Sequence, residues 1–301
     1  MQLTASARLG SVLVGDRFPV RMMAAINVSP ESFYKGSVAG SASSVAVRVR
    51  QAVEEGADLI DIGGASTAPY LDVGVTEEVE KSRVLAGLGA ALEAGAGRTP
   101  ISVDTVRASV AEVALRRGAS VVNDVSGLKG DPAMAKVVRE RGASLLAMAH
   151  SAGSSRMRPI PLVSRSLRQT LRIAERAGID ERLVVLDPGI GFFRNDPGSR
   201  TSSRQTLMPW YEWDCEVIAN LRRLRPLGRP LGVGLSRKSF LGKILGLETP
   251  EERLAGSLAV TAIAVSNGAQ LVRTHDVRET LQAVRAAEAV RARGPRGGRA
   301  S

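Results

Sequence analysis

The stretch Leu183-Val-Val-Leu-Asp187-Pro-Gly-Ile-Gly191-Phe192 decides which fold we expect for this chain. Its apolar run is typical of a strand that is buried on both faces, as the strands of a parallel sheet are. The run stops at a carboxylate, and Pro188, Gly189 and Gly191 then force a turn. A carboxylate at the end of a buried strand costs free energy unless it has a partner or a ligand. Taken alone, Asp187 is better explained as a residue that caps the turn.

A similar pattern recurs along the chain, and in three of four such segments the short apolar run ends in a polar residue. Four segments share a Gly-Ala start, namely Gly56-Ala-Asp-Leu-Ile-Asp61, Gly118-Ala-Ser-Val-Val-Asn123, Gly142-Ala-Ser-Leu-Leu-Ala147 and Gly268-Ala-Gln-Leu-Val-Arg273. In each, we expect the glycine to end a helix in the left-handed conformation, and a buried strand to follow. Looser forms of the pattern lie at residues 22–27, 99–104 and 229–236.

Segments with a helical period separate these strands. They include residues 44–55, 107–117 and 251–267, and Asp276-Val-Arg-Glu279 resembles a capping box that opens the last helix. Strands ending near residues 27, 61, 104, 123, 147, 187, 236 and 273 then alternate with helices over roughly 250 residues, the pattern of a (β/α)8 barrel. A doubly wound open sheet is the alternative, but it should show a glycine-rich dinucleotide turn where this chain has Asn27-Val-Ser-Pro.

The predicted fold class is therefore α/β, a single-domain (β/α)8 TIM barrel. We expect the barrel to span residues 21–293, after an N-terminal extension or hairpin over residues 1–20 and before a basic tail over residues 294–301. A chain of 301 residues is long enough to bury one large core, and 44% apolar and 24% charged residues are typical of a globular protein.

Composition also limits the partners and the compartment. Cys215 is the single cysteine, which fits a reducing compartment, and no apolar run approaches the length of a membrane span. The start of the chain lacks the layout of a signal peptide, so we expect a cytoplasmic protein with no membrane partner. The net charge is +11, but Phe, Tyr and Trp make up only 3% of the residues, so we expect small anionic ligands rather than nucleic acid.

In a barrel, the carboxyl ends of all strands lie on one rim, so the residues that close the strands converge. The rim set is Asn27, Asp61, Asp104, Asn123, Asp187, Lys238, Arg273 and His275. Singly, each has a structural explanation, because Asp104 could cap a helix, Asn123 could close a turn and His275 could be a buried ring. Together they predict a binding site at this rim.

The residue types at the rim indicate two chemistries. Asp104, Asn123 and Asp187 are acceptors suited to the N–H groups of a flat heterocycle, and Lys238 adds a donor for a ring carbonyl or nitrogen. Arg273 and His275, with Asn27 opposite, form an anion-binding half. A ligand with a nitrogen-rich ring at one end and phosphates at the other fits both halves. Since no residues have metal-ligand spacing, we expect any metal to be Mg²⁺ that arrives with the phosphates.

These segments resemble the dihydropteroate synthase family. The matching segments are Asn27-Val-Ser-Pro-Glu-Ser-Phe33, Gly56-Ala-Asp-Leu-Ile-Asp-Ile-Gly-Gly-Ala-Ser-Thr67, Ile101-Ser-Val-Asp104, Val122-Asn-Asp-Val-Ser-Gly127, Leu186-Asp-Pro-Gly-Ile-Gly-Phe192, Ser236-Arg-Lys-Ser-Phe240 and Arg273-Thr-His-Asp-Val277. They run in the family's order over residues 22–280. The resemblance implies condensation of 6-hydroxymethyl-7,8-dihydropterin pyrophosphate with 4-aminobenzoate or a related arylamine, and a possible homodimer.

The resemblance also implies a role for each rim residue. Its pterin-binding set is Asp104, Asn123, Asp187 and Lys238. Its pyrophosphate set is Asn27, Arg273 and His275, with Asn27 also meeting Mg²⁺. Its acceptor loops hold Phe33, Lys35, Ser66, Thr67 and Ser236, and the residues closest to the chemistry are Lys238, Asp187, Arg273 and His275.

Four segments depart from the family pattern. Ala68-Pro-Tyr70 stands where Arg-Pro-Gly is usual, and Lys35 stands where an Asp is usual, so Lys35 could replace the missing cation at position 68. The residues after the fifth strand, at 147–151, differ from the usual Met-His-Met-Gln-Gly, and the loop after the sixth strand is lengthened over residues 195–213.

Three alternatives to a 4-aminobenzoate-specific enzyme therefore stay open. The first keeps the chemistry but takes a larger aminobenzene phosphate as acceptor, as in a methanopterin-type pathway. The second is a methylfolate-binding methyltransferase domain, which shares the fold and part of the pocket. The third is a non-catalytic pterin-binding protein, which leaves Asn27, Arg273 and His275 without a role.

Overall fold

The protein is described here by a computed structural model, which covers residues 4–29, 41–66, 74–95, 99–151, 155–194 and 207–293. The strands are β1 Ser6–Leu9, β2 Val12–Gly15, β3 Arg21–Asn27, β4 Leu59–Gly63, β5 Ile101–Asp104, β6 Val121–Asp124, β7 Ser144–Met148, β8 Val184–Asp187, β9 Gly232–Gly234 and β10 Leu271–Thr274. The α-helices are α1 Ala42–Glu54, α2 Glu77–Glu93, α3 Ala108–Arg117, α4 Met134–Glu140, α5 Pro159–Ala177, α6 Trp210–Ala219, α7 Ser239–Leu245, α8 Leu254–Ser266 and α9 Val277–Arg291. Short 3₁₀ helices are η3 Glu181–Leu183, η4 Leu221–Leu227 and η5 Pro250–Arg253.

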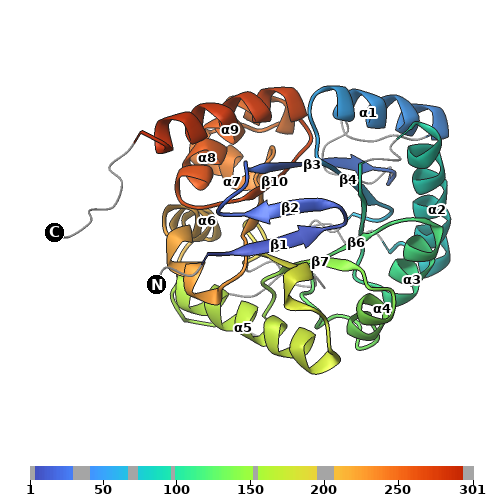
Figure 1. Ribbon diagram of the computed structural model, residues 1–301. Coiled ribbons are helices and arrows are strands. Elements are labelled where there is room, and N and C mark those ends of the chain that lie inside the picture. The colour runs from blue at the N-terminus through green and yellow to red at the C-terminus, as the bar shows by residue number, and fades with distance from the viewer. Residues whose placement is uncertain are drawn as a thin grey trace.

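Within the described residues, β3 to β10 form one parallel sheet of eight strands in the order β8-β7-β6-β5-β4-β3-β10-β9. The two ends of this sheet meet, because Leu186 pairs with Leu231 in a parallel bridge and donates its N–H to the Pro230 carbonyl at 3.0 Å. Helices surround the sheet (Figure 1). The prediction of a (β/α)8 TIM barrel is confirmed.

The four Gly-Ala repeats occupy equivalent places in the barrel. Gly56, Gly118, Gly142 and Gly268 all have positive φ, between 60° and 122°, a region that favours glycine. Each glycine follows a helix and precedes a strand, at β4, β6, β7 and β10 in turn. The repeat in the sequence is therefore one turn type, used four times to bring the chain from a helix back to the barrel.

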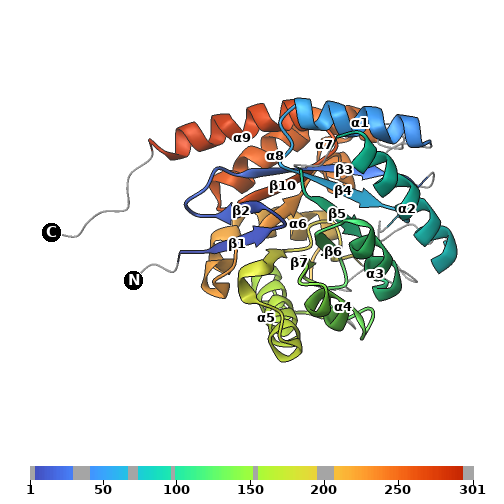
Figure 2. The same cartoon turned by 45° about the vertical axis from the view of Figure 1, so that its right-hand side comes forward.

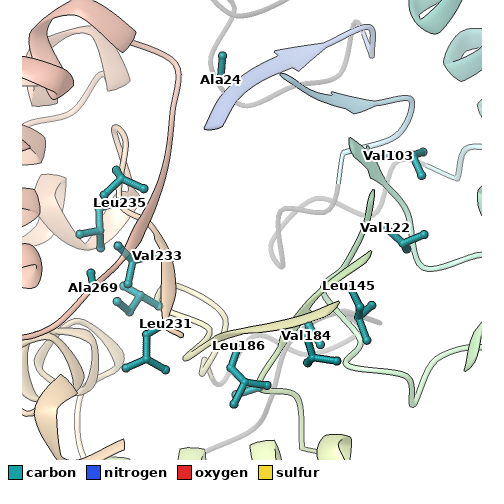
Figure 3. Close-up of a cluster of buried hydrophobic side chains, with 14 of the residues drawn as sticks. Ala24, Val103, Val122, Leu145, Val184, Leu186, Leu231, Val233, Leu235 and Ala269 are labelled. Carbon is teal, nitrogen blue, oxygen red and sulfur yellow. The ribbon is translucent and has the colours of Figure 1, made fainter. Parts of the chain in front are cut away.

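Side chains alternate along each barrel strand, although the sequence of a strand reads as a continuous apolar run. One set of positions, which includes Val103, Val122, Leu145, Leu186 and Val233, points out from the strands into the layer beneath the helices (Figure 3). This outer layer holds the largest cluster of buried apolar residues in the described chain. The alternate positions face the inside of the barrel.

The inward positions change character from one end of the barrel to the other. At the amino ends of the strands they are apolar, with Met23, Leu59, Val121, Leu146, Val185 and Leu271 in one cluster. The antiparallel hairpin of β1 and β2 covers this end and adds Ala7, Leu9 and Val14 to the same cluster (Figures 1 and 2). Further along the same strands, the inward residues include Asp61, Asp104, Asn123, Asp187 and Arg273. The strand pattern therefore closes one end of the barrel and leaves a polar interior at the other.

Three local predictions need correction. The strand expected to end at Asp61 continues to Gly63, and the strand expected to reach Ser236 ends at Gly234. Asp276 does sit at the N-cap of α9, but its carboxylate makes no capping hydrogen bond and instead accepts from Arg237. The ion pair with a buried guanidinium replaces the expected capping box.

No helix in the described parts of the chain is long and apolar enough to cross a membrane. The proposed tail, 294–301, lies outside the described residues.

Candidate active site

A single pocket at the carboxyl ends of the barrel strands brings most of the predicted site residues together. Its lining includes Asn27, Ser66, Asp104, Asn123, Asp187, Ser236, Lys238, Arg273 and His275. These residues come from β3, β5, β6, β8 and β10 and from the segments after β4, β9 and β10. Residues as far apart in the sequence as Asn27 and His275 therefore share one cavity, because the barrel places all its strand ends on one rim.

Asp61 does not line this pocket. Because β4 continues to Gly63, Asp61 lies one layer deeper and its side chain is fully buried. Its Oδ2 accepts hydrogen bonds from Asn123 Nδ2 at 3.0 Å and from Arg273 Nε at 2.6 Å. The prediction that Asp61 lies at the rim was wrong, because its side chain lies beneath the pocket. Its hydrogen bonds orient Asn123 and Arg273, which do line the pocket.

Three residues that line the pocket each have an acceptor oxygen without a hydrogen-bond partner in the described chain. A carboxylate only accepts, so the bond to Asp61 fixes the Asn123 amide with Nδ2 inward and leaves Oδ1 free. Asp104 Oδ1 is buried and unpaired, while its Oδ2 accepts from Arg273 Nη2 at 3.0 Å. Asp187 Oδ1 accepts from the Gly189 N–H at 2.7 Å, which leaves Oδ2. Asp104 Oδ1 is the fully buried one of the three, and because unpaired buried acceptors are rare in folded proteins, it indicates a ligand with N–H donors.

Arg273 connects the two halves that the sequence analysis separated. Its Nε binds Asp61 and its Nη2 binds Asp104, so two of its three nitrogens are committed to carboxylates. Within the described chain Nη1 makes no hydrogen bond, and it is the group left for an anion. The guanidinium therefore orients the acceptor Asp104 and keeps one NH2 group for a further contact.

Burial shifts the pKa of both Asp187 and Lys238 toward neutrality. Removal from water raises the pKa of Asp187 to about 6, although the Gly189 N–H, Lys238 and Arg273 act in the opposite direction. Removal from water lowers the pKa of Lys238 to about 8, opposed mainly by Asp187 and Asp214. Asp187 is ionised above about pH 6 and Lys238 is protonated below about pH 8. The two groups are therefore charged at the same time only between these pH values.

His275 is neutral at physiological pH. Burial and the nearby Arg273 lower its pKa to about 4. Its Nδ1 lies 3.2 Å from the Ala25 carbonyl, which only accepts, so Nδ1 carries the proton and Nε2 is an acceptor in the neutral ring. Binding of an anion at Nε2 requires a second proton, and the anion's own charge favours its uptake.

The loop after β9 is fixed by ion pairing behind the pocket. Arg237 adopts a positive φ of 54° and donates to both oxygens of Asp276, at 2.9 and 2.7 Å. The Ser236 hydroxyl lies 3.3 Å from Asp276 Oδ2 and 3.3 Å from the His275 N–H. These contacts hold Ser236, Lys238 and His275 on adjacent loops in one arrangement.

Comparison with known proteins agrees with this geometry. A family described as "Pterin binding enzyme" matches residues 23–275. The dihydropteroate synthase of Bacillus subtilis (strain 168) is 34% identical over 274 residues, which span 91% of this chain and 89% of that protein. That of Escherichia coli (strain K12) is 33% identical, over 89% and 90% of the two chains. The chain belongs to the dihydropteroate synthase family of pterin-binding enzymes.

Solved structures of this family have the same barrel. The Xanthomonas albilineans dihydropteroate synthase with 4-aminobenzoic acid superposes with a TM-score of 0.81 at 32% identity, covering 96% of this chain and 99% of that one. The same enzyme in complex with 7,8-dihydropteroate gives a TM-score of 0.79. The family resemblance seen in the sequence is therefore confirmed.

One wall of the pocket is apolar, and it was not predicted from the sequence. Val125, Met148 and Phe192 form one buried cluster at this end of the barrel, and Ile190 also lines the pocket. The Lys238 ammonium lies 4.4 Å from the centre of the Phe192 ring. An apolar wall beside a set of ring acceptors suits a flat heterocycle. All four residues lie in segments that the sequence analysis quoted, but their apolar character was not linked to the pocket, and the register of Met148 is now set because it pairs with Asp187.

Sequence analysis also missed Asp214, which lies on α6 and is 1% exposed. Its Oδ1 accepts the Gly191 N–H at 2.8 Å, and its Oδ2 is buried without a partner in the described chain. No local pattern marks it, because more than ten residues of the lengthened loop separate Asp214 from the turn that it contacts, and the last part of that loop, from Trp210, is the first turn of α6.

Part of the acceptor side of the family's site falls outside the described residues. Phe33, Lys35 and Thr67 lie there, as do the Ala68-Pro-Tyr70 departure and residues 195–206 of the lengthened loop. Ser66 and Ser236 are the acceptor-loop residues that the structure places at the pocket.

Proposed function

We propose that this chain is a transferase that condenses 6-hydroxymethyl-7,8-dihydropterin pyrophosphate with 4-aminobenzoate to give dihydropteroate and pyrophosphate. The observation that carries the proposal is the set of three unpaired acceptor oxygens, on Asp104, Asn123 and Asp187, beside an apolar wall. A pterin ring supplies N–H donors for these oxygens and a flat face that can pack against the apolar wall. Relatives of known name and the same fold support the same reaction.

In this reaction the pterin methylene carbon loses pyrophosphate and gains the arylamine nitrogen. Departure of pyrophosphate places positive charge on the pterin and negative charge on the phosphates. The ionised Asp187 stabilises the first, and Arg273 Nη1 with protonated His275 stabilises the second. The Lys238 ammonium donates to the ring and is held over Phe192. The amine proton leaves to solvent after the carbon–nitrogen bond forms, so no side-chain nucleophile is needed.

We propose that Mg²⁺ enters with the pyrophosphate and is held by Asn27. Among the described residues, no group of three or more His, Cys, Asp or Glu side chains is placed to hold a metal ion. A single amide oxygen fits Mg²⁺, which keeps several waters and takes most other ligands from phosphates. Gly63 lies between Asn27 and Asp104, and a Cβ there would be 3.6 Å from Asn27 Oδ1. When bound, the ion neutralises phosphate charge.

An Asn27→Ala variant tests the metal assignment without turnover. Calorimetry of pyrophosphate binding, with and without Mg²⁺, should show a strong metal dependence in the parent and a weak one in the variant. Equal dependence in both would remove Asn27 from the metal site.

The reaction itself is tested by measuring pyrophosphate release from pterin pyrophosphate with a panel of acceptors. We expect release with 4-aminobenzoate and formation of dihydropteroate in equal amounts. Release only with larger aminobenzene phosphates would assign the methanopterin-type acceptor. Pterin binding with no release for any acceptor would indicate a binding protein, and methyl transfer from methylfolate would indicate the methyltransferase alternative.

We also propose a cytoplasmic homodimer. The support is the lone thiol of Cys215, which a reducing compartment keeps free, and the apolar side chains that α7 and α8 expose. Ile244, Leu245 and Ile263 are 43%, 50% and 50% exposed. Sedimentation of the parent and of Ile263→Glu should show a dimer and a weakened dimer, whereas a monomeric parent would exclude the assignment.

A further inference from the structure

Asp214 is a buried carboxylate on α6 that contacts a residue of the pocket wall, Gly191, from outside the barrel. Helix α6 contacts the turn after β8 through two adjacent residues. Trp213 stacks on Phe193, with ring centres 5.3 Å apart and planes at 21°, and Asp214 Oδ1 accepts the Gly191 N–H at 2.8 Å. The turn between Asp187 and Phe193 is therefore held by α6 as well as by its own strand.

Gly191 lies between Asp214 and Lys238. Its φ is +88°, and a Cβ built there would lie 3.1 Å from Lys238 Cδ and 3.2 Å from Lys238 Nζ. The Lys238 side chain therefore passes directly over the one residue whose N–H Asp214 accepts. Asp214 Oδ2 remains buried and unpaired in the described chain, so its charge has no direct hydrogen-bonded counter-ion.

We propose that Asp214 is a positioning residue, which anchors the 188–192 turn through Gly191 and acts as a buried counter-charge for the Lys238 ammonium. The inference rests on the proposed function, because Lys238 is assigned to the pterin ring there. Asp214 does not touch the substrate. It acts through the turn and through the charge of Lys238.

The electrostatics of the pocket agree with this role. The charged groups that face Lys238 are Asp187 on β8, Asp214 on α6 and Asp104 on β5, which raise its pKa, and Arg273 on β10, which lowers it. Asp214 faces Lys238 and Arg194, and burial raises its own pKa to about 7. Asp214 is therefore mostly neutral at pH 6 and mostly charged at pH 8, where about half of the Lys238 ammonium has lost its proton.

The test is a pair of substitutions with a matched control. Asp214→Asn keeps an acceptor for the Gly191 N–H and removes the charge, whereas Asp214→Ala removes both. Glu212→Gln removes one carboxylate from an exposed position on the same helix and serves as the control. The Lys238 titration is followed by NMR on lysine-labelled protein, with the signal assigned from Lys238→Arg, so one readout does not depend on turnover.

We expect the Lys238 midpoint to fall by about one pH unit in Asp214→Asn and to stay in place in Glu212→Gln. The kcat/KM of Asp214→Asn should match that of the parent at pH 6 and fall about tenfold at pH 8.5. Asp214→Ala should also raise KM for the pterin substrate at pH 6, because the turn loses its anchor. If Asp214→Ala does not fold, Asp214→Asn carries the test alone.

An unchanged Lys238 midpoint in Asp214→Asn, or an equal change in Glu212→Gln, would overturn the assignment. A loss of activity that is the same at every pH would also overturn it, since a purely structural role predicts that result. If the parent releases no pyrophosphate from any acceptor, the proposed reaction fails, while the NMR titration still decides the relation between Asp214 and Lys238.

Discussion

The two ends of this barrel are built from the same strands and have opposite properties. At the amino end, the inward residues are apolar and the β1–β2 hairpin covers them, with Leu9 and Val14 fully buried. At the carboxyl end, the inward residues include charged and amide side chains, and Asp61 and Asp104 each keep one buried oxygen unpaired. On β4, for example, the inward position changes from the apolar Leu59 to the charged Asp61 within two residues.

The difference shows where the fold is stabilised and where it is not. Burial of apolar surface against the hairpin stabilises the folded state, whereas desolvated carboxylates at the other end destabilise it. Such unpaired groups persist where a ligand completes them. We therefore expect substitutions at the amino end to lower stability without changing ligand binding, and substitutions at the carboxyl end to impair ligand binding.

The largest effect should come from Arg273→Ala, because it leaves Asp61 and Asp104 buried without their shared cation. We expect a loss of about 3–5 kcal/mol in the free energy of unfolding, together with loss of pyrophosphate binding. Urea denaturation measures the first and calorimetry the second. Arg225→Ala is the matched control, since Arg225 pairs with Asp16 near the hairpin and is 42% exposed, and it should cost about 0–1 kcal/mol. Equal losses of unfolding free energy in Arg273→Ala and Arg225→Ala would mean that the ion pairs of Arg273 contribute no more to stability than an exposed ion pair does.

Truncation of the hairpin plug should give the opposite result. Leu9→Ala opens a cavity in the cluster at the amino end, and we expect a loss of about 2–5 kcal/mol in the free energy of unfolding. The affinity for a pterin analogue should be unchanged, as measured by calorimetry below the unfolding transition. A weakened pterin affinity would show that the two ends are coupled.

Asp187→Asn should weaken pterin binding by about 1.5–3 kcal/mol, because it replaces a charged acceptor. The pKa of Asp187 is raised to about 6, so its contribution to stability is present below about pH 4 and is lost as the pH rises through 6. The variant should therefore be as stable as the parent at pH 4 and equally or more stable at pH 7.5.

Asp180→Asn is the control, because the pKa of Asp180 is shifted in the opposite direction from that of Asp187. Its hydrogen bond from Arg182 lowers the pKa of Asp180 to about 2, so its contribution to stability is present at neutral pH and disappears as the pH falls toward 2. Melting curves that change in the same direction for both variants at pH 7.5 would contradict the comparison.

The smallest effect is expected on the acceptor side. Lys35→Ala should reduce turnover by about tenfold if Lys35 replaces the cation missing at position 68, and Ala68→Arg should restore part of it. Steady-state kinetics on the two single variants and the double variant measure the coupling. If Lys35→Ala turns over like the parent, Lys35 does not replace that cation, and an acceptor other than 4-aminobenzoate becomes the favoured substrate.

Sequence reasoning predicted the barrel and most of the site because both follow local patterns. The apolar runs that end at Asn27, Asp104 and Asp187 identify the strands and the rim at once, since a buried strand places its last polar residue at the mouth. The Gly-Ala repeats identify the turns at the other end for the same reason.

What the sequence could not predict depends on depth and on contacts between distant segments. Asp61 has the same local pattern as Asp104, but β4 runs two residues further and places Asp61 beneath the pocket. The double pairing of Arg273 follows from that depth. Asp214 meets Gly191 across a long loop, and no spacing in the chain marks that contact.

The most direct test of the central claim is the affinity for a dihydropterin alcohol, measured by calorimetry from pH 5 to pH 9. The claim is that the rim binds a pterin through an ionised Asp187 and a charged Lys238. We expect the tightest binding between about pH 6 and pH 8, with weaker binding below as Asp187 gains a proton and above as Lys238 loses one. An affinity that stays constant across this range would contradict the account.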